Sequence, residues 1–350
     1  MAEQNAISSA ALSDASAPPA ADAGRRPASP ILRLILKRVG QGILLLFAVS
    51  VLIFAGTQIL PGDVAQSILG QSATPQALAN LREELGLNQP AYVRYFQWLG
   101  GVLTGDLGTA LSSRQDIASA LLPRLGNTLF LAFWAAFVSI PLAIILGLLA
   151  VRYRNGWVDK AISGLALAST SLPEFFIGYL LVFFFAVPQA WMAMPWFPAI
   201  STVYDGMPFW SRMQAIALPA AALTLVVLAH MMRMTRAAIL NVMQSAYIET
   251  AELKGLSQFT IIRRHAFPNA IAPIVNVVML NLAFLVVGVV VIEVIFVYPG
   301  MGQYLVDHVS KRDVPVVQAV GLIFAAVYIT MNIVADIAAI VANPRLRHPR

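Results

Sequence analysis

Six long apolar segments constrain this chain more than any other feature of its sequence. They cover residues 39–60, 128–151, 162–187, 215–234, 271–297 and 316–341. An α-helix needs roughly 20 residues to cross about 30 Å of hydrocarbon, and each segment reaches that length. Hydrophobic residues make up 59% of the chain and charged residues only 11%, whereas soluble domains carry about a quarter charged residues. The sequence therefore predicts an all-α polytopic membrane protein with six transmembrane helices.

The basic residues indicate how the chain is oriented. The net charge of +6 does not favour nucleic-acid binding, because Lys and Arg cluster at the ends of the apolar segments. Most of them lie on the side that holds both termini and residues 247–268. Loops rich in Lys and Arg face the cytoplasm. We expect a multi-pass protein in contact with the lipid bilayer, with both termini cytoplasmic.

The segment boundaries give a simple domain plan. Residues 1–30 are rich in Ala, Ser and Pro and are expected to form a disordered cytoplasmic tail. Residues 31–60 form the first transmembrane helix, which is too long for a cleaved signal and is expected to be retained. An extracytoplasmic loop follows over residues 61–126, then a transmembrane core over 127–342 and a cytoplasmic C-terminus over 343–350.

The long extracytoplasmic loop carries its own helix signals. One helix is predicted from Pro75 to Gly86 and a second from Pro90. The second contains four aromatic residues: Tyr92, Tyr95, Phe96 and Trp98. Four glycines are then expected to break the chain into turns: Gly100, Gly101, Gly105 and Gly108. We expect a small helical cap whose aromatic side chains pack against the membrane domain, with docking of a soluble partner as the alternative.

Residues 247–268 are too polar to enter a bilayer and too regular for an irregular loop. Apolar side chains recur at helical spacing on both sides of Gly255. Gly255 can adopt the left-handed conformation that ends a helix, and Ser257 can cap the next one. Pro268 is expected to prevent simple continuation of that helix. The pattern predicts two short amphipathic helices at a membrane surface, and by itself it also fits an interfacial hairpin without a partner.

This segment resembles the EAA loop of the membrane subunits of binding-protein-dependent ABC importers. Glu249, Thr250 and Ala251 stand at the Glu-Ala-Ala opening, while Gly255 and Pro268 keep the family's spacing. Thr250, His265 and Phe267 depart from the usual residues. Flanking motifs resemble B-type permeases of the dipeptide/oligopeptide (peptide, nickel and opine) branch: Leu60-Pro61-Gly62-Asp63, Trp98-Leu99-Gly100-Gly101, Gly105-Asp106-Leu107-Gly108, Tyr298-Pro299-Gly300-Met301-Gly302 and Asn343-Pro344-Arg345.

The resemblance implies a permease with the type I ABC importer fold that transports short peptides or related small solutes. It also implies a second homologous permease, two cytoplasmic ATPase subunits and an extracytoplasmic substrate-binding protein. The location that it implies is the bacterial cytoplasmic (inner) membrane. Relatives of this branch also carry nickel complexes, opines and oligosaccharides. The residues that the resemblance assigns to ATPase coupling are Glu249, Thr250, Ala251, Gly255, Leu256, Phe259, Arg263 and Pro268.

The sequence lacks the patterns of an enzyme. It has no G-x-x-x-x-G-K-[ST] phosphate loop, and Gly nowhere precedes Lys. The four histidines lie on different segments without metal-binding spacing, and the chain has no cysteine. We expect neither catalysis nor a metal site in this chain, with ATP and Mg bound by partner ATPase subunits.

Acidic residues inside apolar segments are costly and tend to face a bundle interior or a wet cavity. Glu174 follows Pro173 in the middle of the third segment, where the family usually has a small residue. We assign Glu174, Asn281 and Glu293 to a candidate substrate pathway. For Glu174 and Glu293 a structural role is an equal alternative, and for Asn281 a hydrogen bond between helices, as for Asn332.

Asp336 is expected to form a structural ion pair with Arg233 or Arg236. Two other functions fit the same acids. A proton-coupled secondary transporter would use Glu174, Glu293 and Asp336 as a relay, and a non-transporting scaffold would present the extracytoplasmic cap as its main interface.

Overall fold

A computed structural model describes residues 30–59, 64–69, 73–84, 86–188 and 196–342. The predicted tail up to residue 29, the motif at residues 60–63 and the C-terminal residues 343–350 lie outside this part of the chain. Within it, secondary structure is helical apart from one isolated bridge between Thr109 and Asp116. The elements are α1 (Pro30–Ile59), α2 (Val64–Leu69), α3 (Pro75–Glu84), α4 (Ala91–Thr104), α5 (Ile117–Arg152), α6 (Trp157–Ser171), α7 (Glu174–Phe185), α8 (Phe209–Met243), α9 (Ala246–Leu253), α10 (Gln258–Ile261), the π-turn η2 (Ile262–Ala266), α11 (Phe267–Ile295), α12 (Met301–Ser310) and α13 (Val314–Ala342).

Five of the predicted spans are long apolar helices in the described residues: α1, α5, α8, the α10–α11 run and α13. The third predicted span is wrong as a continuous helix. It consists of α6 and α7, which meet at an angle of 108°. Pro173 causes the break, because proline disfavours helical geometry in the preceding residue, and Leu172 is extended with φ −94° and ψ 134°. The described chain thus has six spans only if the bent pair counts as one.

Two predicted boundaries in the extracytoplasmic loop also need correction. Helix α5 begins at Ile117 rather than near residue 128, because the Asp116 side chain accepts a hydrogen bond from the Ser119 N–H and caps the helix. Gly100 and Gly101 lie inside α4 and do not break it. The helix ends at Gly105, whose φ of 87° is left-handed.

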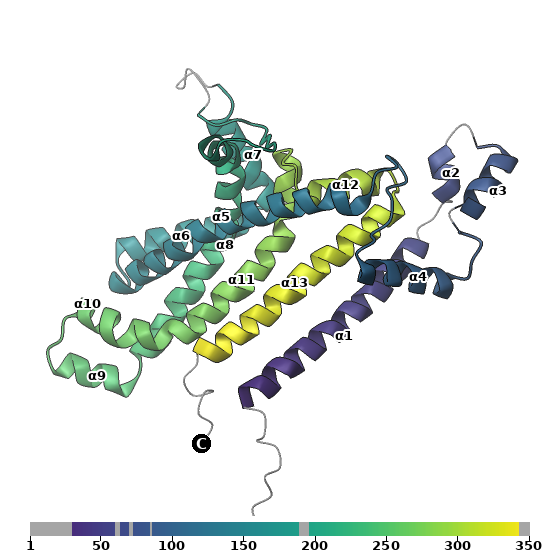
Figure 1. The fold of residues 1–350 in the computed structure, drawn as a ribbon. Coiled ribbons are helices and arrows are strands. Elements are labelled where there is room, and N and C mark those ends of the chain that lie inside the picture. Colours follow the sequence, from purple (N-terminus) through teal and green to yellow (C-terminus); the bar gives the residue numbers. More distant parts are fainter. Residues whose placement is uncertain (1–29, 60–63, 70–72, 85, 189–195, 343–350) are drawn as a thin grey trace, which may run out of the picture.

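The transmembrane core forms around α5, α8 and α11 (Figure 1). Helix α8 packs against α5, α6, α7 and α11, while α13 lies between α11 and α1. Small residues allow the close contact of α5 with α8: a Cβ at Gly147 would lie 2.8 Å from the Thr235 side chain. Close approach at small residues is the usual basis of helix packing in membranes.

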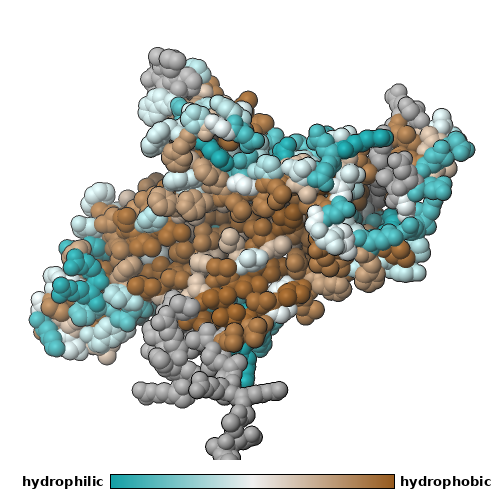
Figure 2. Space-filling view, in the orientation of Figure 1, coloured by the Kyte–Doolittle hydropathy of each residue, from teal (hydrophilic) through white to brown (hydrophobic). Residues whose placement is uncertain are grey.

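The surface shows where the bilayer lies. A broad apolar band crosses the molecule, with hydrophilic surface at the α9–α10 end and over the loops at the opposite end (Figure 2). Leu44, Leu52 and Ile59 on α1 contribute exposed apolar side chains. The start of α1, the end of α13 and the α9–α10 pair lie at the same end of the molecule (Figure 1). Both described chain ends therefore lie on the same side of the band as the α9–α10 pair.

Candidate coupling hairpin and translocation cavity

The α9–α10 hairpin has the local geometry that its sequence predicts. Gly255 adopts a φ of +76° at the turn, and Ser257 Oγ accepts a hydrogen bond from the Thr260 N–H at the start of α10. The Gly255 N–H donates to the Glu252 carbonyl at 2.8 Å and closes the end of α9. The two short helices and the turn between them are confirmed.

One face of the hairpin is buried against the nearby ends of the core helices. Ile248, Ala251 and Ile261 are buried in a cluster with Val151 of α5 and Ile239 of α8. Most of the predicted coupling residues lie on the exposed side instead: Glu249, Thr250, Gly255, Leu256, Phe259, Arg263 and Pro268. Ala251 is the exception, because its side chain packs inside the hairpin. Apolar and charged side chains are thus presented together to the aqueous phase.

The expectation that Pro268 interrupts the helix is wrong. Helix α10 runs through η2 directly into α11, and Pro268 occupies the first turn of α11. Proline removes one N–H and crowds the preceding turn, and the wider π-turn accommodates the ring. The Asn269 side-chain amide donates to the His265 carbonyl at 2.7 Å, which satisfies a carbonyl in that turn. The hairpin is therefore joined to α11 by continuous helical backbone, without an intervening loop.

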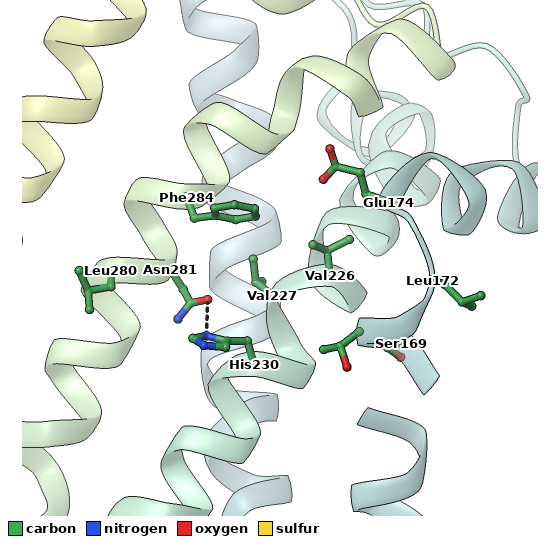
Figure 3. Close-up of a pocket in the computed structure, with 10 residues that line it drawn as sticks. Ser169, Leu172, Glu174, Val226, Val227, His230, Leu280, Asn281 and Phe284 are labelled. Carbon is green, nitrogen blue, oxygen red and sulfur yellow. Dashed lines mark hydrogen bonds between the residues drawn. The ribbon is translucent and has the colours of Figure 1, made fainter. Parts of the chain in front are cut away.

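A cavity of about 540 Å³ opens beside the α6–α7 break (Figure 3). Ser169, Thr170, Leu172 and Glu174 line it from the bent pair. Helix α8 contributes Val226, Val227 and His230, and helix α11 contributes Leu280, Asn281 and Phe284. Several lining residues are strongly exposed, including Leu280 and Phe284, so the cavity opens to one side of the molecule. Its size and mixed lining are typical of sites for small solutes.

Glu174 and Asn281, two of the three predicted pathway residues, both line this cavity. Glu174 is the first residue of α7, not the middle of a continuous helix, and it forms no hydrogen bond or ion pair with the described residues. The Asn281 side-chain oxygen lies 3.2 Å from Nδ1 of His230, and its amide donates to the Val277 carbonyl. Asn281 therefore links α11 to α8, as expected for a helix–helix contact, and also lines the cavity. Asn332 instead donates to Tyr328 within its own helix.

Glu293 is not in the cavity. Its side chain is fully buried, and its two oxygens accept from the Thr128 hydroxyl at 2.6 Å and from the Gly302 N–H at 2.7 Å. The Gln303 N–H adds a longer bond at 3.3 Å. The carboxyl group thus caps the N-terminus of α12 from a neighbouring helix. We correct its assignment: Glu293 does not line the candidate substrate pathway but joins α11 to α5 and to the start of α12. We call this set of hydrogen bonds the latch.

The glycines of the Tyr298–Gly302 motif make room for this latch. A Cβ at Gly300 would overlap the Glu293 carboxyl group, and a Cβ at Gly302 would lie 2.6 Å from Cα of Val290. Burial raises the pKa of the Tyr298 phenol to about 12, and its neutral hydroxyl donates to the Asn127 carbonyl. The sequence reasoning missed this cluster and helix α12, although an acid one or two turns before a Gly-x-Gly helix start was visible.

The predicted partners of Asp336 are wrong. Asp336 pairs with Arg38 of α1, with 3.3 Å between Oδ2 and Nε. Arg236 instead binds both oxygens of Asp159, at 2.9 and 2.8 Å, and ties α8 to the start of α6. Arg233 is exposed. The three acids that a proton relay would need therefore lie in different settings. Glu293 is in the latch, Glu174 lines the cavity and Asp336 forms a surface ion pair.

The cap aromatics divide between two environments. Tyr95 is buried against Phe54 of α1, and its hydroxyl lies 2.8 Å from Ser50 Oγ. Tyr92 and Phe96 are exposed. Packing of the cap on the membrane domain is confirmed for Tyr95. Elsewhere on this side, Asp313 accepts from the Ser112 N–H and hydroxyl and joins the loop before α5 to the start of α13.

Comparison with known proteins identifies the family. The chain matches the family described as "Binding-protein-dependent transport system inner membrane component" over residues 139–348, and that family's N-terminal region over residues 31–132. A putative peptide transport system permease protein of Brucella abortus is 38% identical over 90% of this chain and 99% of its own length. The glutathione transport system permease protein of Escherichia coli is 34% identical over 91% of this chain and 100% of its own length.

A solved structure of the MetNI methionine ABC transporter gives a TM-score of 0.47 at 16% identity, covering 64% of this chain and 96% of that chain. The family match accounts for the all-helical spans and the apolar band. It indicates a multi-pass inner-membrane protein that works with an ATPase and a substrate-binding partner. The chain belongs to the inner-membrane permease components of binding-protein-dependent ABC importers.

Proposed function

We propose that this chain forms one half of the translocation pathway of an ATP-driven importer of short peptides or related small solutes. The observation that carries the proposal is the cavity at the α6–α7 break, which is open on one side and lined by Glu174, His230 and Asn281. A second, homologous permease subunit would cover the open side. Relatives named as peptide and glutathione permeases support the substrate class.

The remaining partners follow from the two ends of the molecule. Two cytoplasmic ATPase subunits would serve the complex, one of them receiving the α9–α10 hairpin in a surface groove. The exposed residues of the hairpin, including Leu256, Phe259 and Arg263, suit such a contact because they combine apolar and charged groups. An extracytoplasmic binding protein would deliver the solute at the opposite end, and both termini would be cytoplasmic. Lys and Arg enrichment on the hairpin side supports that orientation.

The partner ATPase subunits would supply the energy for transport. This chain has no phosphate-binding loop, so ATP and Mg would bind to the ATPase subunits. Closure of the ATPases on ATP would move the hairpin and, through η2, helix α11. Because α11 contributes Asn281 and Phe284 to the cavity, this movement would change the access of the cavity to the two sides.

The test is uptake of a radiolabelled dipeptide, dialanine, by proteoliposomes that contain the complete complex and its binding protein. We expect uptake to require ATP on the hairpin side and to continue when a protonophore collapses the proton gradient. Uptake that needs the gradient and ignores ATP would favour a proton-coupled transporter. The structure offers no support for that alternative, because Glu293 is held by three hydrogen bonds and Asp336 by Arg38.

A further inference from the structure

The cavity contains one acid with no counter-charge among the described residues. Its lining holds no Lys or Arg from that part of the chain, and His230 is the other ionisable residue there. Glu174 also has no hydrogen-bonding or ionic partner among the described residues, although most acids at this depth in a membrane protein are paired. Glu174 lies in the first turn of α7, where the N-terminus of the helix carries partial positive charge.

The surroundings leave the carboxylate free to meet a solute. Gly288 of α11 stands beside it: a Cβ at that position would lie 3.5 Å from Oε2 of Glu174. His230 and Asn281 lie together at the other end of the group of residues in Figure 3, with Val226 and Val227 between them and Glu174. The cavity thus has a negative group at one end, a neutral polar pair at the other and aliphatic side chains between them.

We infer that Glu174 is a specificity-determining residue of this cavity, and that it selects solutes with a protonated amine by binding the ammonium group. The aliphatic middle would hold an uncharged body, and the His230–Asn281 pair would hydrogen-bond a carbonyl or carboxylate further along. A short peptide with a free N-terminus has this chemistry, whereas an N-acetylated peptide lacks the ammonium. The solute class rests on the proposed function, while the charge selectivity of the cavity does not.

The first measurement tests that charge selectivity without ATP or transport. The chain has no cysteine, so Ser169→Cys places one thiol in the cavity. In membrane vesicles containing the native complex, the thiol is reacted with a cationic trimethylammonium-ethyl and an anionic sulfonatoethyl methanethiosulfonate. Glu174→Gln should lower the ratio of cationic to anionic rates about tenfold, because the variant lacks the negative charge that attracts the cationic reagent and repels the anionic one.

Two further variants make the result specific. Asp205→Asn in the same Ser169→Cys background removes an exposed acid from a turn outside the cavity and should leave the ratio unchanged. Thr170→Cys offers a second reporter position in the cavity if Ser169→Cys disturbs the fold. A ratio that Glu174→Gln leaves unchanged, measured at a reactive cavity thiol, would overturn the inference.

The second measurement asks whether the ammonium is the group that is bound. Dialanine should slow the labelling of the cavity thiol at least several-fold more than N-acetyl-dialanine does, and Glu174→Gln should abolish that difference. Equal protection by the two peptides, or none by dialanine, would overturn amine selection. Failure of ATP-driven dialanine uptake together with intact charge selectivity and protection would count against the proposed function alone.

Discussion

At the scale of single residues, the environment of an acid decides its role more than its depth in the sequence does. Glu293 and Glu174 both stand in apolar stretches, yet one is saturated by donors from two elements and the other has none among the described residues. A buried carboxyl group is tolerated when its oxygens are hydrogen-bonded. Glu293 therefore holds together the end of the molecule opposite the hairpin, whereas Glu174 lines the cavity.

Gly300→Ala tests the latch. Its methyl group would overlap the Glu293 carboxyl group, which is already fixed by Thr128 and Gly302. We expect a loss of stability of about 1–3 kcal/mol, the usual cost of overpacking a tight site. The control is Gly164→Ala in α6, where a Cβ would meet nothing within 4 Å. Thermal unfolding of the purified complex in detergent measures the melting temperature of both variants. A Gly300→Ala melting temperature equal to that of the unsubstituted protein would contradict a stabilising role of the latch.

Whether the structural role of a residue can be predicted from the sequence depends on how far away in the chain its partners lie. The left-handed Gly255 and the Ser257 cap were predictable, because both depend on neighbours within three residues. The pairing of Arg38 with Asp336 was not, because it requires α1 to lie against α13. Arg236 likewise finds Asp159 only because α6 packs on α8.

At the scale of elements, prolines in the sequence have two different structural outcomes. The sequence contains prolines in several apolar segments, and those at 123, 141, 219 and 273 remain inside helices. Pro173 instead separates two helices that meet at a large angle. Whether a proline kinks or breaks a span depends on whether neighbouring groups satisfy the freed carbonyls, and a single sequence does not contain that information.

Gly255→Val tests the hairpin as a coupling element. A β-branched residue is strongly disfavoured at the φ of +76° that the turn requires, although the surrounding space is open. We expect ATP-driven uptake to fall at least tenfold while the amount of inserted protein stays normal, as measured by uptake in proteoliposomes and by immunoblot of the membranes.

Gly255→Asn is the matched control, because asparagine tolerates the left-handed region better than other side chains. It should retain most of the transport. Full transport by the valine variant would remove the turn from the coupling mechanism.

At the scale of the whole molecule, the apolar band and the position of the hairpin define a topology. Cysteine labelling tests it without background from this chain, which has no native cysteine. A thiol introduced by Glu252→Cys in the hairpin should react with an impermeant maleimide only in inside-out vesicles. One introduced by Ser113→Cys, in the exposed loop before α5, should react only in intact spheroplasts. The reverse pattern would place the hairpin outside the cell and exclude its contact with an ATPase.

The overall plan was largely predictable, because span lengths and basic flanks depend on composition over about twenty residues. The shape of the cavity was not. It arises where the α6–α7 break leaves space against α8 and α11, and this space depends on three segments far apart in the sequence.

The uninterrupted passage from α10 through η2 into α11 gives the molecule a lever. These 38 residues, from Gln258 to Ile295, form one continuous helical run whose path along the axis is on the order of 55 Å. One end of this run lies in the hairpin, Asn281 and Phe284 lie along its length, and Glu293 accepts hydrogen bonds from α12 near the other end. Because no loop separates α10 from α11, a displacement of the hairpin would be passed along the helix to the cavity wall and to α12.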